Sequence, residues 1–167
     1  MADNLNFSFG LTANLANAAM VAGTTSTYTT SNTTVCVING KFCTTLAAQT
    51  NTATPTLDAT TGAAFIAMTP NNCCALVLGQ NAAGAIKMSQ GPITATLTGV
   101  TTTVGAFIRD PQFPSLPDDF VPLAYTIVRT APSASNWTPG TSSWTASGVS
   151  ATTFQNVVQL PNRPQIA

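Results

Sequence analysis

The side chains that could carry out acid–base chemistry are few. The chain has no histidine, and its five acidic residues are all aspartates. Asp118 and Asp119 form the one adjacent acidic pair, but their side chains diverge in an extended segment and cannot share a proton. Because they follow Pro117, capping a turn is the simpler role for them. Without histidine or glutamate, most hydrolysis and proton transfer near neutral pH is disfavoured.

Lys87 and Ser89 offer a possible nucleophile and base. On a strand, a spacing of two puts both side chains on one face, where a lysine can activate a serine. No strained turn that would present a nucleophile surrounds Ser89, and a solvated strand residue is the simpler role for Lys87. Cys73 and Cys74 have no histidine partner. We therefore expect no enzymatic activity and no catalytic residue.

The same scarcity argues against a bound metal or cofactor. Calcium takes six or more oxygen ligands, and no acidic cluster beyond Asp118 and Asp119 supplies them. The four cysteines do not follow a zinc-binding spacing. The segment 79–84 has a glycine at each end but lacks the lysine and the helix of a phosphate-binding loop. We expect neither a metal site nor a cofactor.

The segment 33–46 contains the clearest structural signal and determines how two cysteines lie. Asn39-Gly40 separates the β-rich runs TTVCVI and KFCTTL, and this pair is preferred in type I′ turns, whose central residues need positive φ. The two-residue loop places Cys36 opposite Cys43 in a hydrogen-bonded pair, with Cα atoms about 5.5 Å apart. That separation permits a disulfide. Two reduced thiols packed as small hydrophobes are the alternative.

Charged side chains make up 6% of the chain, and the formal net charge is zero. Five scattered Lys and Arg residues cannot neutralise a nucleic-acid backbone, so nucleic acid is not an expected partner. A neutral surface also leaves copies without mutual repulsion, which is typical of a protein that lives in an assembly. The apolar stretch 15–22 is too short to cross a bilayer and no basic residue precedes it, so we expect no membrane partner and no secretion signal.

The composition favours an all-β fold. Thr, Val and Ile dominate the segments that look ordered, and Gly and Pro interrupt them. We expect a single β-domain at residues 32–160, built as a β-sandwich or jelly roll, with an extended N-terminal arm at 1–31 and a C-terminal tail at 161–167. Beyond the hairpin, strands are expected at 73–79, 85–90, 123–130 and 152–160.

Two of the later segments have expected roles in packing. Within 123–130, alternation places Leu123, Tyr125 and Ile127 on one face of the strand. The segment 109–122 contains four prolines, so it should be neither a helix nor a central strand. It is expected to cross the body in an extended form and to insert Phe113, Leu116 and Phe120.

The N-terminal arm contains the candidate contacts to a neighbouring molecule. Leu5, Phe7, Phe9 and Leu11 alternate as in a short extended segment, and residues 12–22 could form two or three helical turns. A loose terminus and an arm that reaches onto a neighbour are equally compatible with this composition. If the arm docks, the expected apolar contacts are Phe7, Phe9, Leu11 and Leu15.

Several stretches of the sequence resemble small structural proteins of tailed bacteriophages. They are VINGKFCTTLAAQTNTATPTLDATTGAAFIAM, LVLGQNAAGAIKMSQGPI, PQFPSLPDDFVPLAYTIVRT and FQNVVQLPNRPQ, which lie within residues 37–165. The chain is most similar to a capsid decoration (cement) protein. This resemblance implies a β-rich homotrimer on the capsid surface of the virion, assembled in the host cytoplasm. Such a protein binds the major capsid protein and stabilises the expanded head.

Two other functions are compatible with the sequence. A head-fibre or tail-associated virion adaptor would bind a tail or a host surface instead of the shell. A secreted adhesin or carbohydrate-binding module would use Trp137 and Trp144 to stack on sugar rings. The structural alternative for both indoles is to anchor the long loop 131–147 to the body.

Overall fold

The protein is built from short antiparallel strands joined by long loops. The computed structural model describes residues 10–165, and within that range no helix is present. The all-β class expected from the sequence is therefore confirmed. The strands are β1 (Ala13–Asn14), β2 (Met20–Ala22), β3 (Thr27–Thr30), β4 (Cys36–Ile38), β5 (Lys41–Phe42), β6 (Gln49–Ala53), β7 (Asn72–Gln80), β8 (Ile86–Gln90), β9 (Thr94–Ala95), β10 (Val121–Thr130), β11 (Val149–Ser150) and β12 (Gln155–Asn156).

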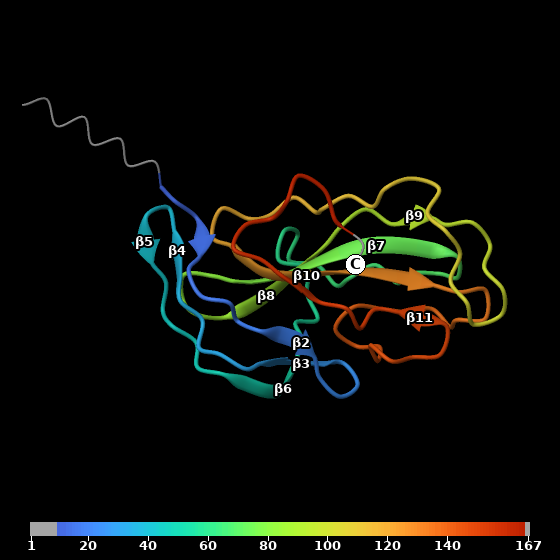
Figure 1. Cartoon of the computed structure of the whole chain (residues 1–167), viewed down its shortest axis with the longest axis horizontal. Coiled ribbons are helices and arrows are strands. Elements are labelled where there is room, and N and C mark those ends of the chain that lie inside the picture. Colours follow the sequence, from blue (N-terminus) through green and yellow to red (C-terminus); the bar gives the residue numbers. More distant parts are fainter. Residues whose placement is uncertain (1–9, 166–167) are drawn as a thin grey trace, which may run out of the picture.

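The largest sheet contains the two longest strands, β7 and β10. Its order is β11-β10-β7-β8, with β12 also paired to β10 and β9 paired to β7 (Figure 1). β7 is buried along nearly its whole length. Leu76 and Leu78 pack into one cluster and Val77 into another, on the opposite face of the sheet. The expectation of a continuous apolar strand covered on both faces is confirmed.

A β-bulge in β10 decides which of its side chains face the main core. The register against β7 shifts between Pro122 and Ala124. Leu123 packs in the same cluster as Ala124, whereas Tyr125 and Ile127 pack in the cluster on the opposite face. The prediction that Leu123, Tyr125 and Ile127 share one face is thus wrong for Leu123. One extra residue at a bulge inverts the alternation of everything before it.

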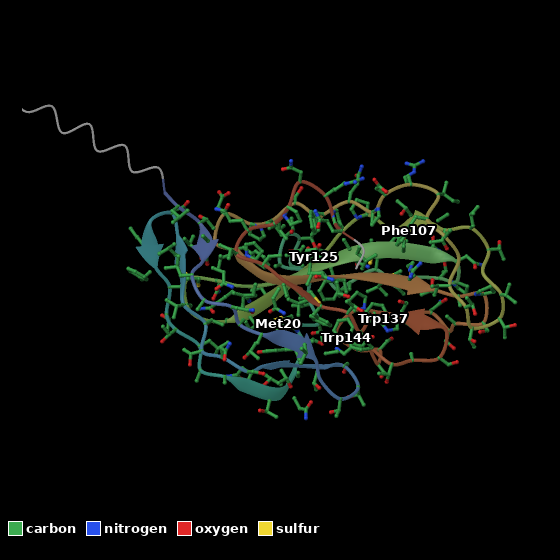
Figure 2. All side chains as sticks on the ribbon, viewed as in Figure 1. Met20, Phe107, Tyr125, Trp137 and Trp144 are labelled. Carbon is green, nitrogen blue, oxygen red and sulfur yellow. The ribbon has the colours of Figure 1, made fainter. Side chains whose placement is uncertain are left out.

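The sheet β2-β3-β6 lies over one face of the largest sheet. Met20 of β2 and Tyr28 of β3 share a buried cluster with Leu76 and Leu78 of β7. Figure 1 shows β2, β3 and β6 grouped below the β7–β10 pair, and Figure 2 shows Met20 and the two tryptophans in the space between. The main core therefore lies between these two sheets.

The segment 13–30 is part of the folded body, so the arm expected at 1–31 does not extend to residue 31. It contains β1, β2 and β3, and it buries Ala18, Met20 and Tyr28 in the main core. The helical turns expected within 12–22 are also wrong. Asn14 and Asn17 each accept a hydrogen bond from the backbone N–H two residues ahead, and this local pairing competes with helix formation.

The C-terminal segment is attached to the body through Tyr125 and β1. The backbone N–H of Gln165 donates to the Tyr125 hydroxyl at 3.0 Å, and that hydroxyl donates back to the Gln165 carbonyl at 3.3 Å. The strand expected at 152–160 is reduced to β12, which pairs with β10 at two residues. The chain then turns to β1, where the Val158 carbonyl accepts a hydrogen bond from Asn14 N at 3.0 Å.

The proline-rich segment 109–122 has no regular structure before β10 begins. Phe120 at its end is 3% exposed. Phe113 and Leu116 pack against the same cluster as Phe120, and the Phe113 ring meets Tyr125 edge-on with centroids 5.0 Å apart. The expected extended crossover with inserted apolar side chains is confirmed.

Candidate functional site

The β4–β5 hairpin forms as its turn residues dictate. Asn39 and Gly40 have φ values of 51° and 75°, as a type I′ turn requires. Ile38 pairs with Lys41 and Val37 with Phe42, which confirms the predicted register. The backbone N–H of Cys43 donates to the Cys36 carbonyl at 2.9 Å. The hairpin positions one set of side chains outward and another toward the body.

The outer side of the sheet β1-β4-β5 is apolar and partly open to solvent. Ala13 of β1 lies opposite Val37, which lies opposite Phe42, so these three side chains share a face. The β1 pairing continues at both ends: Gly40 N donates to the Leu11 carbonyl at 3.0 Å, and Leu15 N donates to the Val35 carbonyl at 2.7 Å. Since Leu11 and Leu15 are each two residues from Ala13, they project on this same face.

A fourth exposed apolar residue, Val158, lies beside β1 on the edge away from β4. Asn14 donates through its backbone N–H to the Val158 carbonyl at 3.0 Å and through its side-chain amide to the Val157 carbonyl at 3.2 Å. We define the apolar end face as the exposed members of this group. Their exposed fractions are Leu11 50%, Leu15 49%, Phe42 75% and Val158 61%.

The apolar end face includes two of the four contacts expected from the sequence. Leu11 and Leu15 are half-exposed on it, while Phe7 and Phe9 lie outside the described residues. Figure 1 shows β1, the blue strand near the start of the described residues, beside β4. Sequence reasoning missed Phe42, although the register that placed Cys43 inward also places Phe42 outward. Nothing local to the sequence identified Val158, which hydrogen bonds to Asn14 bring beside β1.

The inner side of the same small sheet is closed against β10. Cys36, Ile38 and Cys43 form a buried cluster with Val121. All four cysteines are free thiols. Burial and the neighbouring Cys43 raise the pKa of Cys36 to about 12, so this thiol stays protonated at neutral pH. The structure thus has the pair as two thiols packed as small hydrophobes, which is one of the two alternatives that the sequence left open.

A separate groove of about 730 Å³ lies beside the end of β8. Its walls combine the loop 58–66, the segment 90–93 that follows β8, and part of the proline-rich crossover. Asp58 is its acidic residue, but the carboxylate is fully engaged. It accepts hydrogen bonds from the backbone N–H groups of Thr60, Thr61 and Gln90 at 2.7–2.9 Å. This arrangement holds the loop that begins at Asp58 in place against β8.

Replacing Asp58 by asparagine is expected to destabilise the fold. Both carboxylate oxygens accept hydrogen bonds from backbone N–H groups. Asparagine would replace one of these oxygens with an NH₂ group, which would then face a backbone N–H donor. We expect a loss of about 2 kcal/mol, measured from the midpoint of urea unfolding. Asp110→Asn is the matched control, because Asp110 is exposed and pairs with Arg163 at the surface; its effect should stay within about 0.5 kcal/mol. Equal effects of the two substitutions would contradict this role for Asp58.

Lys87 and Ser89 lie two residues apart on β8 and so on one face, as expected, but their surroundings differ. Ser89 is buried and its hydroxyl lies 3.2 Å from that of Thr60, whereas Lys87 is exposed. Asp119 accepts a hydrogen bond from the backbone N–H of Ala82 at 2.8 Å, which ties it to the loop after β7 and not to a turn next to Pro117. Among residues 10–165, no group of three or more His, Cys, Asp or Glu side chains could hold a metal ion.

Both tryptophans are core residues. Trp137 and Trp144 are 1% and 0% exposed, and their rings pack with centroids 5.5 Å apart. The Trp137 indole N–H donates to the Ser143 carbonyl at 2.8 Å, and that of Trp144 donates to the Thr27 carbonyl at 2.8 Å. Neither ring can stack on a sugar from solvent, so a carbohydrate site built on these two residues is wrong. They anchor the loop to the body.

Comparison of the chain with known protein families, with curated proteins and with solved structures finds no match. Within residues 10–165, no helix has the length and apolar character needed to span a bilayer. Within the described residues, the proposed function rests on the apolar end face, which lies over the buried cysteine pair.

Proposed function

We propose that the protein is a capsid decoration (cement) protein of a tailed bacteriophage. It binds the major capsid protein on the capsid surface of the virion and stabilises the expanded head. It acts as a homotrimer and has no enzymatic role. The observation that carries the proposal is the apolar end face on a chain of which 6% is charged. Such a surface favours burial against other protein.

The charges that the chain does have support the same conclusion. Of its five basic residues, Arg163 pairs with Asp110 at 2.7 Å and Arg129 lies over the Phe107 ring at 5.0 Å. On the hairpin, Lys41 is the one charged residue and adjoins Phe42. Long-range electrostatic steering is therefore weak, and affinity must come from apolar and backbone contacts, multiplied over symmetric copies.

The area that a stable interface needs implicates the N-terminal segment as well. Such an interface buries about 800 Å² on each partner, which is more than the four side chains of the apolar end face supply. The chain before Leu11 continues the apolar alternation with Phe7 and Phe9. We propose that this segment extends the apolar end face over the neighbouring capsid subunit.

The test is binding of the purified protein to shells of the major capsid protein. Analytical ultracentrifugation should give a trimer, and sedimentation should carry the protein down with expanded shells. A monomer that stays in the supernatant would overturn the proposal. Binding to purified tails or to host cells, without binding to shells, would identify the head-fibre or tail-associated adaptor instead.

A further inference from the structure

The cysteine pair behind the apolar end face has the geometry of a covalent modification site. Cys36 and Cys43 lie one step beyond the Val37–Phe42 pair, on adjacent strands, and are joined by a backbone hydrogen bond of 2.9 Å. Cα atoms in such a pair are about 5.5 Å apart, within the range of about 4.4–6.8 Å found in disulfides. Both side chains belong to the same buried cluster with Ile38 and Val121.

We propose that Cys36 and Cys43 are an oxidation site, at which hydrogen peroxide or a similar small peroxide closes a disulfide between β4 and β5. The reduced pair supports the hairpin by packing and one backbone hydrogen bond, and the oxidised pair fixes its register covalently. Because the disulfide lies on the inner side of the sheet, Phe42 keeps its position on the outer side. This proposal stands on the hairpin geometry and does not depend on the proposed function.

The exposed fractions of the two residues assign the order of the steps. Cys43 is 8% exposed and Cys36 is 1% exposed, so the peroxide meets Cys43 first. One oxygen atom is transferred to the Cys43 sulfur, which gives a sulfenic acid and releases one water. The Cys36 sulfur then attacks the Cys43 sulfur, the S–O bond breaks, and the leaving hydroxide takes up the Cys36 thiol proton to form the second water. Two thiols and one peroxide thus give one disulfide and two waters.

The other two cysteines provide an internal control. Cys73 and Cys74 are adjacent on β7 and both are fully buried. Their side chains contact different partners: the Cys73 sulfur lies 3.1 Å from the Thr94 hydroxyl, and the Cys74 sulfur lies 3.3 Å from that of Met68. Neither is expected to react with peroxide while the protein stays folded.

Tryptic digestion can detect the disulfide because a lysine lies between the two cysteines. Lys41 is the one basic residue between Cys36 and Cys43, and the next is Lys87. Trypsin therefore separates Cys36, in peptide 1–41, from Cys43, in peptide 42–87. After peroxide treatment of the folded protein, unfolding and alkylation, these two peptides should remain joined, with both Cys73 and Cys74 alkylated. Reduction before alkylation should separate them.

Two variants make the assignment specific. Cys43→Ser should abolish the joined peptides, whereas Cys73→Ser should leave them unchanged. The oxidised wild type should melt about 5 °C higher than the reduced protein, and Cys43→Ser should show no such shift. Four alkylated cysteines after treatment, a joined product in Cys43→Ser, or disulfide-linked dimers on a non-reducing gel would each overturn the proposal. None of these outcomes depends on shell binding, so failure here is separate from failure of the proposed function.

Discussion

Trp144→Ala is expected to destabilise the protein by about 4 kcal/mol, because it removes a completely buried ring from the junction of three segments. The Trp144 ring meets Phe154 edge-on at 5.3 Å and packs against Trp137 at 5.5 Å. Its indole N–H also satisfies the Thr27 carbonyl of β3. Urea unfolding followed by circular dichroism measures the loss as a lower midpoint with a similar slope.

Trp144→Phe separates the contribution of the ring from that of the hydrogen bond. Phenylalanine keeps most of the apolar volume but leaves the Thr27 carbonyl without the indole donor, so we expect a loss of about 2 kcal/mol. A Trp144→Ala protein as stable as the wild type would contradict the anchoring role. It would also reopen the possibility that the ring acts at a surface.

The second large effect is expected on shell binding, which rests on the proposed function. Phe42 and Leu15 are 75% and 49% exposed on the same side of the β1-β4-β5 sheet. Burying a Leu or Phe side chain contributes roughly 1.5–3 kcal/mol, so the double variant Phe42→Ser, Leu15→Ser should weaken binding at least about 100-fold. Sedimentation with expanded shells over a range of concentrations measures this change.

The matched control for this variant is Val100→Ser. Val100 is 75% exposed, as Phe42 is, but it lies in the loop that follows β9, at the opposite end of the molecule from β4 and β5 (Figure 1). Because these exposed side chains contribute little to the core, substitution at any of the three positions should leave the melting temperature nearly unchanged. Equal loss of binding in the control and the double variant would show that the apolar end face is not the contact surface.

Features that depend on short stretches of chain were predictable from the sequence. The Asn39-Gly40 turn specified the hairpin because positive φ at two neighbouring residues is a strictly local demand. The pairing of Cys36 with Cys43 followed from that turn by counting. The apolar character of β7 likewise predicted a strand covered on both faces.

Features that depend on distant partners were not predictable. The bulge at Pro122 and Ala124 leaves no mark in the alternation of β10, so the side on which Leu123 packs was missed. The segment 13–30 looked like an arm because its sequence is polar and featureless. Its buried side chains find their core only through sheets formed with β4 and β6. For the candidate site, Leu11 and Leu15 were predicted from the sequence. Val158 could not be predicted, because its place depends on a hydrogen bond to Asn14, 144 positions away in the chain.

The pairing of the first strands with the last residues has a consequence for biosynthesis. Met20 is bound at both its backbone N–H and its carbonyl by the Asn156 side chain, at 2.7 and 2.9 Å, and Asn14 is bound by residues 157 and 158. A growing chain on the ribosome has neither partner until residues 156–158 have been translated. We expect products that end before residue 156 to lack a finished edge at β1. Under the proposed function, this would keep incomplete copies from competing for positions on an assembling particle.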